Sequence, residues 1–280
     1  MTTVVHRARG TEQAAHRTPG RTAPTGARVL RAEWTKLTSV RSNAWLALGI
    51  VAVTAATAFG LGMFVGPDDG RSGSWVVTSG FVLAQVGFLV LGGLVGTSEY
   101  VTGTARSTFT AVPRRLPVLA AQVQVTSVAA LTTAVVALGA SYLVTTGARA
   151  GGAPALDLAV PGTSRALLGF VLVSVAVALL GVGLGAVLRH PASAVVGGVV
   201  LTLVADQLLA ANPGRVTDTI RAFLPSSGSR LTQDDAAVAA LDAMTLGPRL
   251  GVWGGGVVVL AWVLVVLTAA VYRLSRHDVR

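Results

Sequence analysis

Six apolar stretches, each long enough to cross a lipid bilayer, constrain the fold of this chain more than any other feature of its sequence. An α-helix rises about 1.5 Å per residue, so roughly 20 apolar residues span the hydrocarbon core. The stretches cover about residues 44–65, 75–97, 118–146, 165–188, 192–211 and 250–271. We therefore predict an all-α membrane protein whose six transmembrane helices form one domain, residues 28–280.

Composition and charge support this prediction. The 280 residues are 52% hydrophobic and 12% charged, whereas charged residues make up about 25% of a soluble domain. The predicted cytoplasmic segments hold 15 of the 22 Lys and Arg residues and 4 of the 12 Asp and Glu residues, while the predicted outer segments hold 7 of each. This asymmetry follows the positive-inside rule. It places both termini in the cytoplasm and explains the net charge of +10 without a nucleic-acid partner.

The chain before the first span divides into two parts. Residues 1–27 are polar and basic with no apolar period, which predicts a disordered cytoplasmic tail. From residue 28, Leu30, Trp34 and Leu37 recur at helical spacing. This predicts a basic amphipathic helix against the headgroups of membrane lipid, with a soluble surface helix as the alternative. The residues that we assign to this interfacial helix are Arg31, Glu33, Trp34, Lys36 and Arg41.

The longest polar interruption on the predicted cytoplasmic side runs from Glu99 to Pro117. Hydroxyl side chains are interleaved with apolar ones along it, and Pro113 and Pro117 would end a helix. The pattern predicts a short amphipathic helix at the membrane surface with one face free to bind a partner. The alternative is a solvated loop whose arginines only set the membrane topology.

The sequence offers no residues for catalysis. A phosphate-binding P-loop needs Gly-Lys-Ser/Thr, and the only lysine, Lys36, stands between Thr35 and Leu37. The four histidines have no second ligand at helical spacing, and the chain lacks cysteine, so we expect neither a metal site nor thiol chemistry. If the protein uses ATP, we expect another subunit to bind it.

Two polar residues within the predicted spans are candidates for a substrate path: Gln85 in the second span and Asp206 in the fifth. Asp206 lies about five residues from the outer end of its span, roughly 8 Å deep, where water can still reach it. A structural role paired with another helix and a substrate-facing role both fit that depth. For Gln85, an interhelical hydrogen bond is the alternative to substrate contact.

Two further patterns concern packing. Residues 212–249 form the largest outer segment, and they predict two short helices against the outer membrane face. Small residues recur four apart in three spans, and such pairs let helices approach closely in lipid. The pairs are Gly92 and Gly96, Gly181 and Gly185, and Gly251 and Gly255.

Two motifs flank the first two spans. Residues 31–42 are Arg-Ala-Glu-Trp-Thr-Lys-Leu-Thr-Ser-Val-Arg-Ser. Residues 99–115 are Glu-Tyr-Val-Thr-Gly-Thr-Ala-Arg-Ser-Thr-Phe-Thr-Ala-Val-Pro-Arg-Arg. With the six-span layout from residue 28, these motifs resemble the permease subunits of ABC-2 type transporters of the bacterial exporter class.

The resemblance implies a connecting helix at 28–42 and a coupling helix at 99–115 that docks on a separate ABC ATPase subunit, where ATP and Mg²⁺ would bind. Two permease chains, identical or different, would pair in the bacterial inner (cell) membrane and export a cargo along a path lined mainly by spans 2 and 5. The resemblance assigns ATPase coupling to Glu99, Tyr100, Thr102, Gly103, Thr104, Arg106, Thr108, Arg114 and Arg115.

Two other functions stay open at this point. An ion-coupled secondary carrier or channel would transport without ATP and would depend on Asp206. A non-transporting membrane scaffold or immunity protein would tolerate replacement of residues 99–115.

Overall fold

Helices dominate the computed structural model, which describes residues 26–66, 69–101, 116–148 and 152–276, and no strand occurs in these ranges. Six helical segments there are long and apolar enough to cross a membrane, which confirms the predicted helical, multi-pass architecture. They are α2 (Arg41–Phe64), α3 with α4 (Gly73–Thr78, Phe81–Val101), α6 (Leu116–Ala148), α7 (Thr163–Leu188), α8 to α9 (Pro191–Ala210) and α12 (Gly251–Arg276).

Two predicted features fall wholly or largely outside the described residues. The predicted tail does so up to residue 25, and helix α1 (Gly26–Ser39) begins just before the predicted start of the interfacial helix. The predicted coupling helix lies outside from 102 to 115. Its residues Thr102, Gly103, Thr104, Arg106, Thr108, Arg114 and Arg115 therefore stay predictions, as does the role of the Tyr100 side chain.

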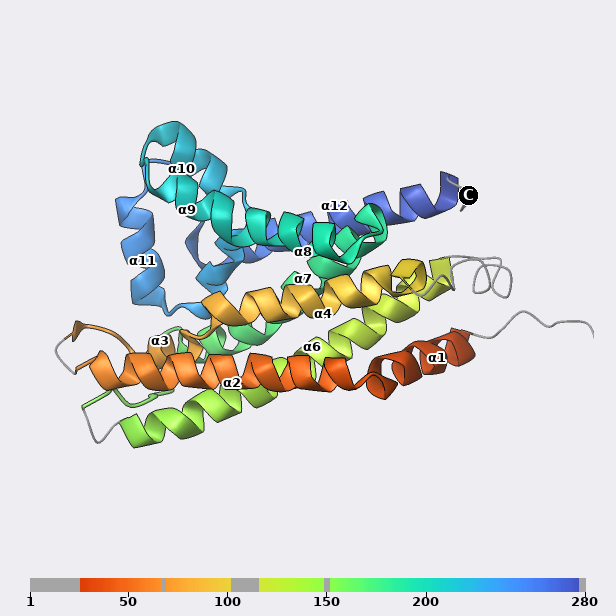
Figure 1. The fold of residues 1–280 in the computed structure, drawn as a ribbon. Helices are drawn as coiled ribbons and strands as arrows, with labels where there is room; N and C mark the ends of the chain where they lie inside the picture. Colours follow the sequence, from red (N-terminus) through yellow and green to blue (C-terminus); the bar gives the residue numbers. More distant parts are fainter. Residues whose placement is uncertain (1–25, 67–68, 102–115, 149–151, 277–280) are drawn as a thin grey trace, which may run out of the picture.

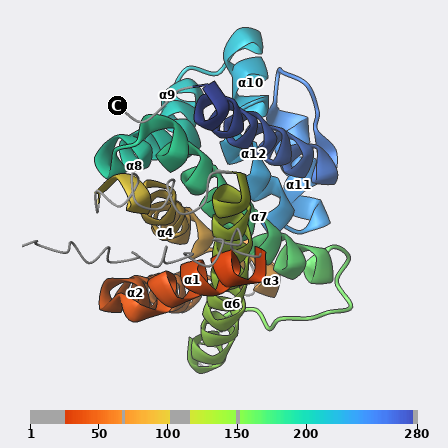
Figure 2. The same cartoon turned by 90° about the vertical axis from the view of Figure 1, so that its right-hand side faces the viewer.

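The long helices lie side by side along a common direction (Figure 1). Helix α1 and the carboxyl end of α12 lie at one end of the bundle, called here the α1 end. Helices α3, α10 (Arg215–Ala222) and α11 (Asp235–Met244) lie at the other, called the α10 end. Seen along the bundle, α7 lies among α4, α6 and α12 (Figure 2), and it contacts all three. More than half of the α7 residues are buried, so this helix forms the centre of the core.

Helices α4 and α7 contact each other backbone to backbone through glycine. A Cβ atom on Gly92 would lie 1.8 Å from the carbonyl oxygen of Ala178, and one on Gly96 would lie 2.3 Å from that of Val182. From the other side, a Cβ on Gly181 would lie 2.4 Å from the carbonyl oxygen of Leu89. The predicted glycine pairs of the second and fourth spans thus pack against each other, as expected for close helix contact in lipid.

The third predicted pair, Gly251 and Gly255 of α12, does not act as one helix contact. Gly251 begins α12 with φ +61°, a left-handed conformation that favours glycine, and a Cβ there would meet nothing within 4 Å. A Cβ on Gly255 would lie 2.0 Å from the carbonyl oxygen of Ser227 in the 3₁₀ segment η4 (Pro225–Thr232). Gly255 therefore makes room for η4, whereas Gly251 shapes the start of the helix.

The outer segment holds the two predicted short helices, α10 (Arg215–Ala222) and α11 (Asp235–Met244), and between them a 3₁₀ segment, η4 (Pro225–Thr232). η4 packs into the membrane bundle against α7 and α12. On α7, a Cβ on Gly169 would lie 1.9 Å from the carbonyl oxygen of Leu231. Part of this segment is thus inserted between helices at the α10 end, whereas the sequence predicted that the segment lies against the membrane face.

The fifth span is not a regular α-helix. A five-residue π-helix, η3 (Val200–Val204), separates α8 (Pro191–Val199) from α9 (Ala205–Ala210). A π turn accommodates roughly one extra residue, which rotates the following side chains by about 100°. This rotation sets the direction in which Asp206, the second residue of α9, faces.

We predict that Gly92→Ala destabilises the protein, because the added Cβ would force the α4 and α7 backbones apart. Overpacking a well-packed core costs about 1–3 kcal/mol. Thermal unfolding of the detergent-purified protein measures this cost as a lower Tm. The matched control is Gly139→Ala in α6, where a Cβ meets nothing within 4 Å. Equal Tm values for the two variants would contradict the close contact.

Candidate functional site

An ion-pair network with buried carboxylates and a partly exposed lysine joins three helices at the α1 end. The ammonium of Lys36 on α1 donates a hydrogen bond of 2.6 Å to Glu33 Oε1, and it also donates to Glu99 Oε1 on α4. The side chain of Gln122 on α6 hydrogen-bonds Glu33. Glu33, Glu99 and Gln122 are only 5%, 3% and 4% exposed. We call these four residues the ion-pair network.

The spacing of residues on α1 explains this placement. Val29 and Glu33 stand four apart, so they share the face that α1 turns to the bundle, and both are buried. Val29 packs against Val118 and Ala121 of α6. Lys36 follows Glu33 by three residues, which lets its long side chain reach both carboxylates.

The environment shifts the pKa of two groups in the network. Burial raises the pKa of Glu33 above its ordinary value of 4.5, and the hydrogen bond from Lys36 offsets part of this shift. Burial alone would lower the pKa of Lys36, but its hydrogen bonds to Glu33 and Glu99 outweigh that effect, so its pKa lies above 10.5. Lys36 is therefore charged at neutral pH and stabilises the buried carboxylates.

The predicted interfacial and coupling residues thus divide into two groups. Glu33 and Glu99 are buried, and each accepts a hydrogen bond from Lys36, whose side chain is 46% exposed. Arg31, Trp34 and Arg41 are exposed. Glu99 accepts a hydrogen bond from Lys36 of α1, and the ATPase-coupling role that the resemblance assigns to it stays a prediction.

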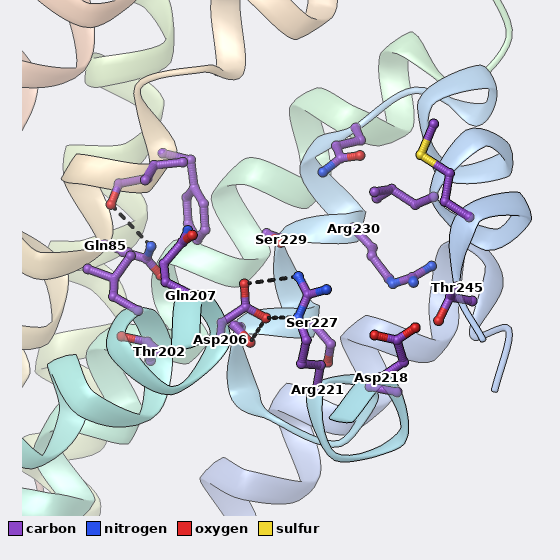
Figure 3. Close-up of a pocket in the computed structure, with 18 of the residues that line it drawn as sticks. Gln85, Thr202, Asp206, Gln207, Asp218, Arg221, Ser227, Ser229, Arg230 and Thr245 are labelled. Atoms are coloured by element: carbon purple, nitrogen blue, oxygen red, sulfur yellow. Dashed lines mark hydrogen bonds and ion pairs between the residues drawn. The ribbon is translucent and has the colours of Figure 1, made fainter. Parts of the chain in front are cut away.

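A polar cavity of about 470 Å³ lies at the α10 end between α4, α9 and the outer segment (Figure 3). Both predicted substrate-path residues, Gln85 and Asp206, line it. The Asp206 carboxylate accepts hydrogen bonds from Arg221 Nε at 3.2 Å, from Arg221 Nη2 at 3.4 Å and from Ser226 Oγ at 3.2 Å. The Gln85 amide donates to the carbonyl oxygen of Val82 in its own helix, at 3.1 Å.

The charges that line the cavity are balanced. They are the acids Asp206 and Asp218 and the bases Arg221 and Arg230. Arg230 pairs with Asp242 at 2.6 Å, and Asp218 accepts the backbone N–H of Leu246 at 2.9 Å. The remaining polar lining consists of hydroxyl and amide groups, on Gln85, Thr202, Gln207, Ser226, Ser227, Ser229, Gln233 and Thr245.

This arrangement suits hydrogen bonding to a small molecule in a site without net charge. No group of three or more His, Cys, Asp or Glu residues in the described ranges is placed to hold a metal ion. Asp206 therefore pairs with a neighbouring helix and lines a cavity, while its contact with a substrate stays a prediction.

Sequence reasoning missed several residues of both sites, above all Gln122, Arg221 and Arg230. One signal was present. A lone acid near the outer end of a span needs a cation, and the next basic residues in the chain, Arg215 and Arg221, stand in the outer segment that follows. Gln122 is one of several amides in the chain, and nothing in the sequence marks it.

Comparison with known proteins does not identify the chain. A scan against models of known protein families finds no match. A search among curated proteins also finds none.

We predict that Lys36→Met destabilises the protein by about 1–3 kcal/mol, because it removes the ammonium donor shared by two buried carboxylates. Adding Glu99→Gln should restore part of the loss, since an amide needs no counter-charge. The measurement is the Tm of the purified protein, with Arg41→Met, the loss of an exposed cation, as the control. A Lys36→Met variant as stable as Arg41→Met would show that the network does not hold α1 in place.

A double-mutant cycle tests the ion pair in the cavity. Combining Asp206→Asn with Arg221→Met should give a coupling energy of about 0.5–3 kcal/mol, as for other side chains in direct contact. The reference cycle replaces Arg221→Met by Arg215→Met, an exposed arginine on the same helix, and should give a coupling near zero. Equal couplings in the two cycles would refute the pairing.

Proposed function

We propose that this chain is the membrane-spanning permease subunit of an ATP-driven ABC exporter of the ABC-2 type. It pairs with a second permease chain in the bacterial cell membrane, with both termini in the cytoplasm. ATP and Mg²⁺ bind a partner ATPase subunit. The permease contributes the path for the cargo.

One observation carries the proposal: helix α4 connects the ion-pair network to the polar cavity. Glu99 lies near its carboxyl end and Gln85 near its amino end. Glu99 follows Gln85 by 14 residues, which corresponds to about 21 Å of helix at 1.5 Å per residue. A permease needs such an element, because motion of an ATPase on one side of the membrane must reach a binding site near the other side.

The contacts of α4 favour rigid transmission. Its glycine contacts with α7 leave little space for the two helices to slide. The Lys36 bonds couple α1 to the end of α4, and the chain continues from Val101 into the segment 102–115, the predicted coupling helix. A displacement of that segment would move α1, α4 and α7 together and change the width of the cavity. Rigid helices that span two sites are a physical means of such coupling.

The ion-coupled carrier has less support. In that reading Asp206 would bind the coupling ion, yet its carboxylate already accepts bonds from Arg221 and Ser226. A guanidinium next to the carboxylate supplies the positive charge that an ion would otherwise bring. The exporter proposal requires no free acid in the membrane.

We predict that the chain co-purifies in detergent with its ATPase subunit, and that the double variant Arg106→Ala with Arg114→Ala weakens the complex. The expectation follows from the predicted role of these arginines in docking. The amount of ATPase retained on the tagged permease measures it. The control is Arg215→Ala, an exposed arginine at the α10 end, which should retain the full amount.

Two results would count against the proposal. One is the absence of a complex with any ATPase of the same cell. The other is a complex that the two arginine changes leave intact, which would move the docking site away from residues 99–115.

A further inference from the structure

A groove on the outside of the bundle, between α1 and α6, has the features of a lipid site. It is about 740 Å³ in volume, within the roughly 300–1,000 Å³ typical of small-molecule sites. On α1 it is lined by Ala27, Leu30, Arg31 and Trp34. These positions follow the spacing i, i+3, i+4 and i+7, so they form one stripe along the helix.

The stripe is separate from the face that α1 turns to the bundle. Val29 and Glu33 are buried, whereas Leu30 and Trp34 are 36% and 43% exposed. On α6, the groove is lined by Val123, Gln124, Val125, Ser127 and Val128, mostly apolar side chains. Two apolar walls that are open to the surroundings, in a helix bundle of a membrane protein, provide a surface for an acyl chain.

The depth of the groove matches the edge of the hydrocarbon core. Helix α6 has 33 residues and is therefore about 50 Å long, roughly 20 Å more than the core of a bilayer. Val123 and Val128 lie 7 and 12 residues after Leu116, which is about 10–18 Å from the start of the helix. If the excess length is shared between the two ends, this is where headgroups meet hydrocarbon.

The charge on the groove selects the headgroup. Arg31 lines the groove, and none of the ion pairs among the described residues involves it. Arg28 is exposed one helical turn earlier. Lys36, in contrast, is bound to the network carboxylates. The exposed side of α1 is therefore cationic, and Trp34 is a residue type that favours the membrane interface.

We propose that the groove between α1 and α6 binds an anionic phospholipid, with one acyl chain between Leu30, Trp34 and Val128 and the phosphate paired with Arg31. The site is independent of the proposed export function. It stabilises α1 from the outside, while the ion-pair network holds it from the inside.

Native mass spectrometry of the full chain, purified with a mixture of phosphatidylglycerol and phosphatidylcholine, tests the proposal. We expect preferential retention of phosphatidylglycerol and a loss of about fivefold in Arg31→Gln, the effect of one basic residue near an anionic headgroup. Ala27→Trp, which fills the groove from an exposed position, should also reduce retention with Arg31 intact. Arg215→Gln at the α10 end is the matched control and should retain lipid as the wild type does.

Two results would overturn the proposal. One is equal retention of the two lipids by the wild type. The other is an Arg31→Gln variant that retains as much phosphatidylglycerol as Arg215→Gln. Excess inorganic phosphate is a further arm of the experiment. Displacement of the lipid by free phosphate would mean that the site recognises phosphate alone and that the groove does not hold an acyl chain.

Discussion

The backbone contact between α4 and α7 is the interaction on which the rest of the structure depends. In lipid, apolar side chains gain little from leaving one apolar environment for another, so helices associate through close packing. Gly92 and Gly96 on α4, and Gly181 on α7, bring the two backbones within van der Waals distance. Because α7 also contacts α6 and α12, this contact fixes α4 within the bundle and fixes the direction of both of its ends.

The contact between α4 and α7 also determines where the two charged sites lie. Charge in or near a membrane is costly unless it is paired, and both sites satisfy this requirement at opposite ends of α4. Lys36 pairs with carboxylates from two helices at one end, and Arg221 pairs with Asp206 near the other. Each pair joins segments that are distant in the sequence or separated by a turn, so each stabilises the arrangement of helices.

The sequence predicted the elements well, because span length and the absence of charge follow directly from the thickness of a bilayer. It also predicted close helix contact at the glycines of the second and fourth spans, and it named Gln85 and Asp206, which line the same cavity. It did not predict the partners. The bond between Lys36 and Glu99 joins residues 63 positions apart, and no periodicity encodes such a pair. The insertion of η4 into the bundle depends on space left by Gly169 and Gly255, which is visible only in three dimensions.

The π-helix before Asp206 is another feature that could not be predicted from the sequence. A hydropathy pattern fixes that residues 191–210 form a span, but the extra residue in the turn at 200–204 changes which face the later side chains occupy. From a regular helix one would assign Asp206 to a different face from the one that meets Arg221. Local irregularity of the backbone, which stems from packing, therefore decides the chemistry of the cavity.

In the proposed transporter, helix α4 carries a change from the ion-pair network to the polar cavity. The chain lacks cysteine, so one cysteine at Gln207, an exposed residue that lines the cavity, can hold an environment-sensitive fluorophore. The measurement is its emission in the complex with a cysteine-free ATPase, with and without ATP. We predict a change in emission on ATP binding that Lys36→Met abolishes and Arg41→Met preserves. An emission that ignores ATP, or that responds equally in both variants, would contradict it.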